Sequence, residues 1–128
     1  MSSQDDNTPD DLVQEGAWGA VRYATDANGD MPAKEFVDGL DPAERRKVVV
    51  LFERIAEKGQ IHNREQFKKL RGDIYEFKRF QIRIACFQEG RNWLLVYGLR
   101  KKKDKWRESE LERAERIISE HRQRRERQ

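Results

Sequence analysis

Large apolar residues recur every three or four positions between residues 41 and 59, which predicts an amphipathic helix. Asp41 and Glu44 have the spacing of a capping box at its start, and Gly59 is the kind of residue that ends a helix. A shorter apolar pattern at residues 32–40 predicts a preceding helix. Because almost no residues separate the two segments, we expect a helical hairpin.

A third helix is expected near the end of the chain. Ser109 and Glu112 have the spacing of a second capping box, and apolar residues follow at helical spacing from about residue 110 into the low 120s. Residues 123–128 are almost entirely charged or amide residues. We interpret them as a short charged tail.

The other hydrophobic segments have the alternation or the length of β-strands. In residues 80–87, every second side chain points to one face, so that Ile82 and Ile84 lie opposite Arg83 and Phe87. A near-continuous apolar run follows, which is typical of a central strand covered on both faces. The expected strands are residues 17–25, 74–78, 80–87 and 92–99.

The order of these elements, β-α-α-β-β-β-α, predicts an α+β fold. We expect a curved antiparallel sheet, with the helical hairpin and the C-terminal helix packed on one side. Residues 1–16 are polar and acidic, and we interpret them as a disordered N-terminal tail. The predicted division is therefore a tail at 1–16, a domain at 17–122 and a charged tail at 123–128.

Charge is distributed unevenly along this chain of 128 residues, whose net charge is +3. Residues 1–44 hold two cations and eleven acids, for a net charge of −9. Residues 45–99 carry +7 and residues 100–128 carry +5, with four consecutive cations at 100–103. A localised basic surface is typical of nucleic-acid binding, whereas a solvated loop is the alternative interpretation of the cationic run.

Several classes of protein are disfavoured by what the sequence lacks. The single Cys86 excludes an internal disulfide and a multi-cysteine metal site. No apolar run is long enough to span a membrane and no signal-peptide pattern opens the chain, so we expect a cytoplasmic protein without a membrane partner. His62 and His121 are not at metal-ligand spacing, and we interpret both as surface residues. We expect no metal and no small-molecule cofactor.

Three motifs follow the hairpin in a characteristic order: a Lys-Leu-Gly-aromatic-Glu segment, an Arg-Ile pair before an aromatic residue, and an apolar strand that ends in lysines. They are Lys69, Leu70, Gly72, Tyr75, Glu76 and Phe77; then Arg83, Ile84 and Phe87; then residues 95–102. Their order and spacing resemble the RelE/ParE toxin superfamily, and within it the HigB-like, phage-derived branch. The resemblance covers about residues 17–121.

Members of this superfamily are toxins of type II toxin–antitoxin pairs. The RelE and HigB branches are ribosome-dependent mRNA endonucleases that use Lys and Arg side chains on the concave sheet face, without metal. The resemblance implies the same activity here, with a helix-turn-helix antitoxin, mRNA and the ribosome as partners. Two alternatives stay open: a ParE-like toxin that inhibits gyrase without nuclease activity, and a catalytically inert homologue that binds nucleic acid or the ribosome.

The resemblance and the basic segments together select the candidate residues. The expected catalytic residues are Arg83, Lys78, Lys101 and Lys102. The expected RNA- or ribosome-binding residues are Lys68, Lys69, Arg71, Arg79, Arg100 and Lys103. The chain departs from its relatives in carrying Lys78 where many have Arg, and in lacking both a Pro after the lysines and a C-terminal Tyr. These departures leave the general acid and base unassigned.

Arg83 is the most informative candidate, because it interrupts an apolar strand. A guanidinium fixed on a rigid strand can bind a phosphate through two parallel hydrogen bonds. The alternatives are a solvent-facing residue or a charge partner for Glu76 on the neighbouring strand. We expect Arg83 to face the concave side of the sheet, away from the helices.

Overall fold

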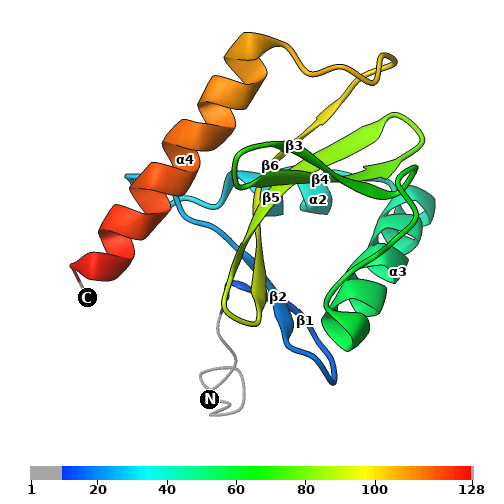
Figure 1. Ribbon diagram of the computed structural model, residues 1–128, viewed down its shortest axis with the longest axis horizontal. Coiled ribbons are helices and arrows are strands. Elements are labelled where there is room, and N and C mark those ends of the chain that lie inside the picture. Colours follow the sequence, from blue (N-terminus) through cyan, green and yellow to red (C-terminus); the bar gives the residue numbers. More distant parts are fainter. Residues whose placement is uncertain (1–9, 128) are drawn as a thin grey trace.

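The computed structural model describes residues 10–127, which form six strands and three helices (Figure 1). The predicted α+β class is confirmed. The elements in chain order are β1 (Leu12–Glu15), β2 (Ala20–Tyr23), α2 (Pro32–Asp38), α3 (Pro42–Lys58), β3 (Phe67–Arg71), β4 (Ile74–Arg79), β5 (Ile82–Glu89), β6 (Asn92–Arg100) and α4 (Glu108–Glu126). In this part of the chain, no helix combines the length and the apolar composition that crossing a membrane requires.

The six strands form one open, curved sheet in the order β1-β2-β6-β5-β4-β3. Strands β3 to β6 are the predicted antiparallel meander, extended by one edge strand. The prediction of a wholly antiparallel sheet was wrong, because β2 pairs with β6 in parallel. Two helices and three strands separate β2 from β6 along the chain, so no short turn forces the two strands to run in opposite directions.

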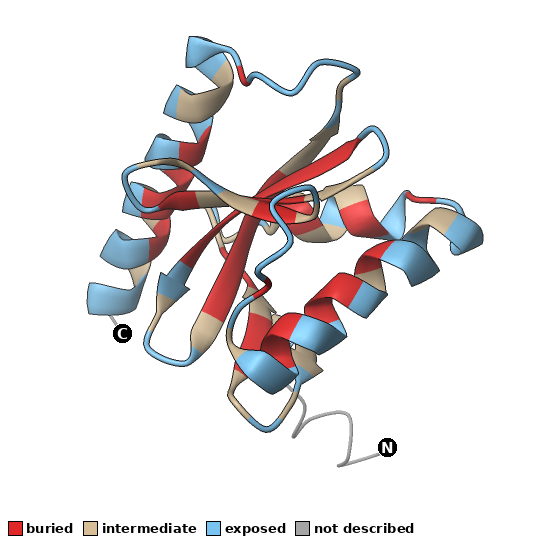
Figure 2. Cartoon of the chain, turned by 45° about the vertical axis from the view of Figure 1, so that its right-hand side comes forward, coloured by how far each residue is buried: buried red, intermediate tan, exposed pale blue. Residues whose placement is uncertain are grey.

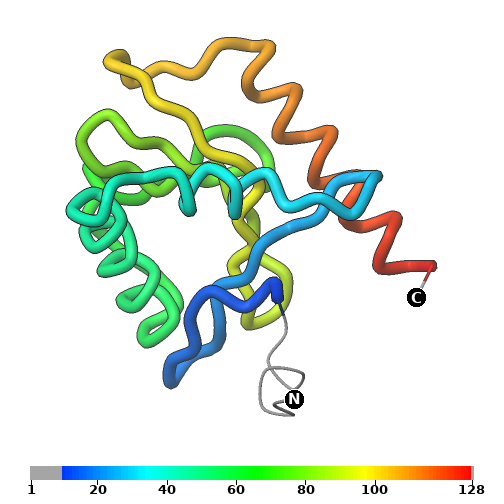
Figure 3. Tube along the Cα trace, turned by 180° about the vertical axis from the view of Figure 1, so that it is seen from behind, coloured from blue at the N-terminus to red at the C-terminus, as the bar shows by residue number. Residues whose placement is uncertain are grey.

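The helices cover both faces of the sheet, and the prediction that they pack on one side was wrong. Helices α2 and α3 pack on one face, and α4 packs on the other, as the two opposite views show (Figures 1 and 3). The alternation in β5 accounts for this: Ile82 and Ile84 join the α2–α3 cluster, whereas Ala85 and Phe87 join the α4 cluster. A strand that is apolar on both faces needs cover on both, and Figure 2 shows buried residues along the central strands.

The local signals at the helix ends had mixed outcomes. The capping box of α3 is confirmed, because Asp41 Oδ1 accepts a hydrogen bond from the Glu44 amide at 2.9 Å. The second predicted box, Ser109 with Glu112, was wrong. Helix α4 begins at Glu108, and the Arg107 amide donates to Glu110 Oε1 at 2.7 Å. The same spacing therefore occurs, two residues earlier than predicted.

The ends of the folded part extend beyond the predicted domain. Strand β1 lies inside the stretch interpreted as an N-terminal tail and pairs with β2. Helix α4 continues to Glu126, into the stretch interpreted as a C-terminal tail. Residues 1–9 and residue 128 of the two predicted tails lie outside the described residues.

Candidate functional site

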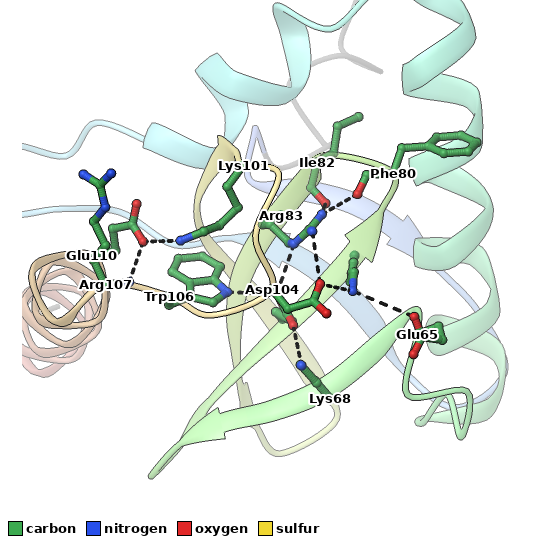
Figure 4. Close-up of polar contacts among 12 residues, drawn as sticks. Glu65, Lys68, Phe80, Ile82, Arg83, Lys101, Asp104, Trp106, Arg107 and Glu110 are labelled. Atoms are coloured by element: carbon green, nitrogen blue, oxygen red, sulfur yellow. Dashed lines mark hydrogen bonds and ion pairs between the residues drawn. The ribbon is translucent and has the colours of Figure 1, made fainter.

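Three cationic side chains from three adjacent strands share the α4 face of the sheet. Lys68 of β3 stands opposite Glu76 of β4, and Lys78 of β4 stands opposite Arg83 of β5. Side chains two residues apart on a strand share a face, so all four side chains lie on the same surface. Helix α4 covers another part of this face. Residues 101–107, the segment between β6 and α4, contact the cluster through Asp104 and Trp106, which lie beside Arg83 and Lys68 in Figure 4.

Glu76 is the fixed point of the cluster, with 0% of its surface exposed. Its Oε1 accepts a hydrogen bond from the indole Nε1 of Trp106 at 2.9 Å. Lys68 Nζ lies 3.7 Å from Oε2, and Arg83 Nε lies 3.9 Å from Oε1. A buried carboxylate destabilises a fold unless charges and hydrogen bonds compensate it. Glu76 thereby ties β3, β5 and the segment 101–107 to β4.

Arg83 is almost fully buried, with 2% exposed, and lies on the face that α4 partly covers. The expectation that it faces away from the helices was wrong. One terminal nitrogen donates to the carbonyls of Phe80 and Ile82, the latter at 3.1 Å, and the other terminal nitrogen lies 3.5 Å from Asp104 Oδ1. Arg83 therefore lies close enough to Glu76 to be its charge partner, which is one of the alternatives considered from the sequence. The outer edge of the guanidinium faces Asp104.

Asp104 closes the outer side of the cluster. Its Oδ1 accepts a hydrogen bond from Lys78 Nζ and lies beside the Arg83 guanidinium (Figure 4). The hydrogen bond from Lys78 is the main cause that lowers the pKa of Asp104, and the charges of Lys78, Lys68 and Arg83 act in the same direction. The Asp104 side chain is 66% exposed. It is therefore an ionised group at the surface, bound to two cations that are themselves largely covered.

Sequence reasoning missed Asp104, although a signal was present. It is the only acid in the run from Arg100 to Lys105. A lone acid among cations has many candidate partners, and the sequence does not show that two of them lie on β4 and β5.

Lys101 does not join the cluster. Its Nζ pairs with Glu110 Oε1 at 2.5 Å and lies 5.5 Å from the centre of the Trp106 ring. Burial alone would raise the pKa of Glu110, but the hydrogen bonds from Lys101 and the Arg107 amide outweigh it and lower the pKa. Lys101 therefore stabilises the start of α4 in this arrangement.

Two more of the predicted cations hold helices to the sheet. Arg71 contacts Glu108 at 2.9 Å and Glu115 at 3.2 Å on α4. Arg100 contacts Glu44 on α3 at 2.7 Å, and this hydrogen bond is the main cause that lowers the pKa of Glu44 to about 2. The sequence predicts that Arg71 and Arg100 bind RNA, but in the fold their guanidinium groups are paired with carboxylates of the protein.

The remaining predicted cations have no acidic partner within residues 10–127. Lys69, Lys102 and Lys103 are exposed, and Arg79 is half-buried beside Phe80. Lys102 and Lys103 line an open cavity of about 890 Å³ between the segment 101–107 and the start of α4. Of the ten candidate residues, the structure brings Lys68, Lys78 and Arg83 together and places Lys102 and Lys103 on the segment beside them.

The interpretation of both histidines as surface residues was wrong for His121. Its ring is buried, with 7% exposed, and Nδ1 accepts a hydrogen bond from the Thr25 amide at 3.0 Å. Burial lowers the pKa of His121, which keeps the ring neutral. His62 is exposed, as expected.

Comparison with models of protein families assigns the chain to a known family. The sequence model of a family described as "Phage derived protein Gp49-like (DUF891)" matches residues 35–119. The matched range begins within α2 and ends within α4, so it contains every side chain of the cluster around Glu76 and Asp104. A search of curated proteins found no match.

Proposed function

Because the chain belongs to the Gp49-like family of phage-derived proteins, a RelE- and toxin-like family, we propose that it is the toxin of a type II toxin–antitoxin pair and cleaves mRNA. Within the RelE/ParE superfamily we assign it to the HigB-like branch, on the order and spacing of its motifs. The proposed partners are a helix-turn-helix antitoxin, the ribosome and ribosome-bound mRNA, so the proposed site of action is the cytoplasm.

One observation carries the proposal: an acidic group at the surface is bound by two covered cations. Asp104 lies between Lys78 and Arg83, with most of its own side chain in solvent. A phosphodiester has the same sign of charge and the same kind of acceptor oxygens, and Arg and Lys bind it strongly. We infer that the phosphate of bound RNA takes the place of the Asp104 carboxylate.

This placement suits cleavage by the neighbouring 2′-hydroxyl. The 2′-oxygen forms a bond to phosphorus while the bond from phosphorus to the 5′-oxygen breaks. One proton leaves the 2′-hydroxyl and one reaches the departing 5′-oxygen. Negative charge grows on the phosphoryl oxygens in the transition state, where Arg83 and Lys78 stabilise it more than in the ground state. In this scheme the two cations supply the charge stabilisation, so the proposed reaction needs no metal.

The proton carriers belong to the segment that covers the site. Lys102 is free of acidic partners among residues 10–127, and Lys101 becomes free if the segment 101–107 moves when RNA displaces Asp104. A positioned lysine side chain can donate a proton to the reacting group or accept one from it, which is the role of a general acid or base. Lys102, Lys103 and Lys69 remain available for phosphates of mRNA or ribosomal RNA.

The test is to induce the chain in cells and to map the 5′ ends of mRNA. The parent protein should generate new ends inside translated regions, and Lys78→Gln should generate far fewer. Lys34→Gln is a matched control, because Lys34 is a surface cation on α2 that pairs with Asp38 one turn further along the same helix. Growth arrest with broken DNA and no new mRNA ends would support gyrase inhibition. A chain without any effect on growth would be an inert homologue.

Asp104→Asn tests the position of the phosphate separately. The variant should bind single-stranded RNA more tightly than the parent, because no internal carboxylate competes for Lys78 and Arg83. An affinity equal to or weaker than that of the parent would show that RNA binds elsewhere.

A further inference from the structure

Phe80 combines two unfavourable features in one residue. It lies in the tight turn between β4 and β5 with φ at +55°, and it is the only residue other than glycine with positive φ in residues 10–127. Its side chain is 63% exposed. A bulky residue is strained in this conformation, and glycine would be favoured there. Strain at an exposed position frequently marks a functional residue.

The surroundings of the Phe80 ring are cationic. Lys47 Nζ and the guanidinium carbon of Arg79 each lie 4.8 Å from the ring centroid. Neither cation has an acidic partner within residues 10–127, and Arg79 Nε is buried without any hydrogen-bond partner. Lys78 and Arg100, by contrast, are neutralised by carboxylates. The turn therefore offers an aromatic surface together with uncompensated positive charge.

The backbone of this turn touches the proposed phosphate site. The Phe80 carbonyl accepts a hydrogen bond from the Arg83 guanidinium, while the ring points away from Asp104 toward α3 (Figure 4). An RNA strand that continues from the phosphate position at Arg83 across the β4–β5 turn would meet the Phe80 ring next. Arg83 also fixes the turn in the conformation that exposes the ring.

We propose that Phe80, Lys47 and Arg79 form a binding site for one nucleotide of single-stranded RNA. Lys47 and Arg79 lie over the ring in the absence of RNA. When RNA binds, they move onto the adjoining phosphates and the base stacks on the ring. Single-stranded nucleic-acid sites combine cations that follow the backbone with aromatic side chains that stack on bases. The two cations without acidic partners favour a polyanion over an apolar protein surface. The proposal rests on the proposed function, because it extends the path of the RNA beyond Arg83.

Phe80→Gly separates binding from folding, which few variants of an aromatic residue can do. Glycine adopts positive φ without strain, so the thermal midpoint should equal or exceed that of the parent. Affinity for a short single-stranded RNA should fall by roughly 5- to 150-fold, the range for losing one stacked base. An otherwise identical abasic RNA should bind parent and variant equally, whereas Phe80→Trp should retain affinity for the normal RNA.

Val50→Ala is the matched control, since Val50 on α3 is the other exposed large apolar residue in residues 10–127, at 47%. It should leave RNA affinity unchanged. The proposal is overturned if Phe80→Gly binds RNA as the parent does, or if it loses affinity equally for normal and abasic RNA. Measuring RNA cleavage in the same samples distinguishes the proposed nuclease activity from the proposed nucleotide site. A parent that binds RNA through Phe80 without cutting it refutes the nuclease, and a parent that cuts while Phe80→Gly binds normally refutes the nucleotide site.

Discussion

Replacing Arg83 with Met should destabilise the protein as well as inactivate it. Methionine keeps much of the length of the arginine side chain but removes the charge beside Glu76, which has no exposed surface. Removing one partner of a buried ion pair typically costs 3–5 kcal/mol, because the other charge stays buried without compensation. Because Arg83 is buried beside Glu76, its removal should affect folding as well as RNA binding.

The geometry places the loss in the free energy of unfolding at the lower end of that range. Glu76 keeps its hydrogen bond from Trp106 and its contact with Lys68 in the variant. Arg83 Nε lies 3.9 Å from Glu76 and makes no hydrogen bond to it, so the lost interaction is electrostatic. The carbonyls of Phe80 and Ile82 also lose a donor. We expect a loss of about 3 kcal/mol.

A second substitution separates structure from activity. Glu76→Gln in the Arg83→Met background removes the uncompensated charge while retaining an acceptor for the Trp106 indole. Unfolding in urea should show most of the lost stability restored in the double variant, since replacing both members of a buried pair is often close to neutral. RNA cleavage should stay absent, because the proposed phosphate ligand is still missing.

Two results would refute this reasoning. If the free energy of unfolding of Arg83→Met lies within about 0.5 kcal/mol of that of the parent, the charge of Arg83 does not compensate the buried Glu76 carboxylate in solution. If the double variant recovers cleavage together with stability, Arg83 acts only through the fold and does not contact the phosphate. Arg83→Lys is the conservative control: it keeps a charge near Glu76 but cannot present two parallel donors, so it should retain more stability than activity.

Three further predictions address the core, the basic segment and the buried histidine. Leu51→Ala should lower the free energy of unfolding by roughly 2–5 kcal/mol, because Leu51 is packed between α3 and the sheet; an unchanged thermal midpoint would place the wrong face of α3 inward. Changing Lys102 and Lys103 to Gln should lower the log–log salt dependence of RNA binding by about 1.4, at about 0.7 per single-strand contact, and an identical slope would exclude both residues. Lowering the pH from about 7 to about 5.5 should destabilise the protein, because burial lowers the pKa of His121 and the unfolded chain then takes up a proton that the folded chain refuses. His121→Gln should flatten this part of the stability profile, and a variant profile parallel to that of the parent would show that burial of His121 does not cause the pH dependence.

The parts of the fold that followed from the sequence are those set by neighbouring residues. The helical repeat before Gly59 and its Asp41 cap specify α3 with no other information. The alternation around Ile84 fixed which side chains of β5 share a face. The short turns fixed the antiparallel meander.

The parts that did not follow depend on contacts between distant segments. The pairing of β2 with β6 joins residues about 70 positions apart in the chain, and no turn records its direction. Strand β3 is polar at the sheet edge, with two lysines, so its sequence lacks the hydrophobic pattern of a strand. His121 looked like a surface residue because its hydrogen-bond partner, Thr25, lies 96 positions earlier.

In the candidate site, the positions of the charges could be read from the sequence, but their partners could not. The sequence places four cations side by side at residues 100–103, where mutual repulsion suggests an external anion. In the fold, Arg100 is neutralised by Glu44 and Lys101 by Glu110, so two of the four already have internal partners. The acid that ends the run, Asp104, reaches back to Lys78 and Arg83 on the sheet.

The internal pairing narrows where RNA can bind. Arg100 and Lys101 cannot contact phosphates without releasing carboxylates that connect to α3 and to the start of α4. The Asp104 carboxylate pairs with strand residues and not with a helix, and its side chain is already mostly in solvent. Replacing it with a phosphate therefore breaks fewer structural contacts than releasing Glu44 or Glu110 would. Lys102 and Lys103 need no rearrangement at all. The favourable path for an RNA strand therefore runs over the two exposed lysines to the position of Asp104.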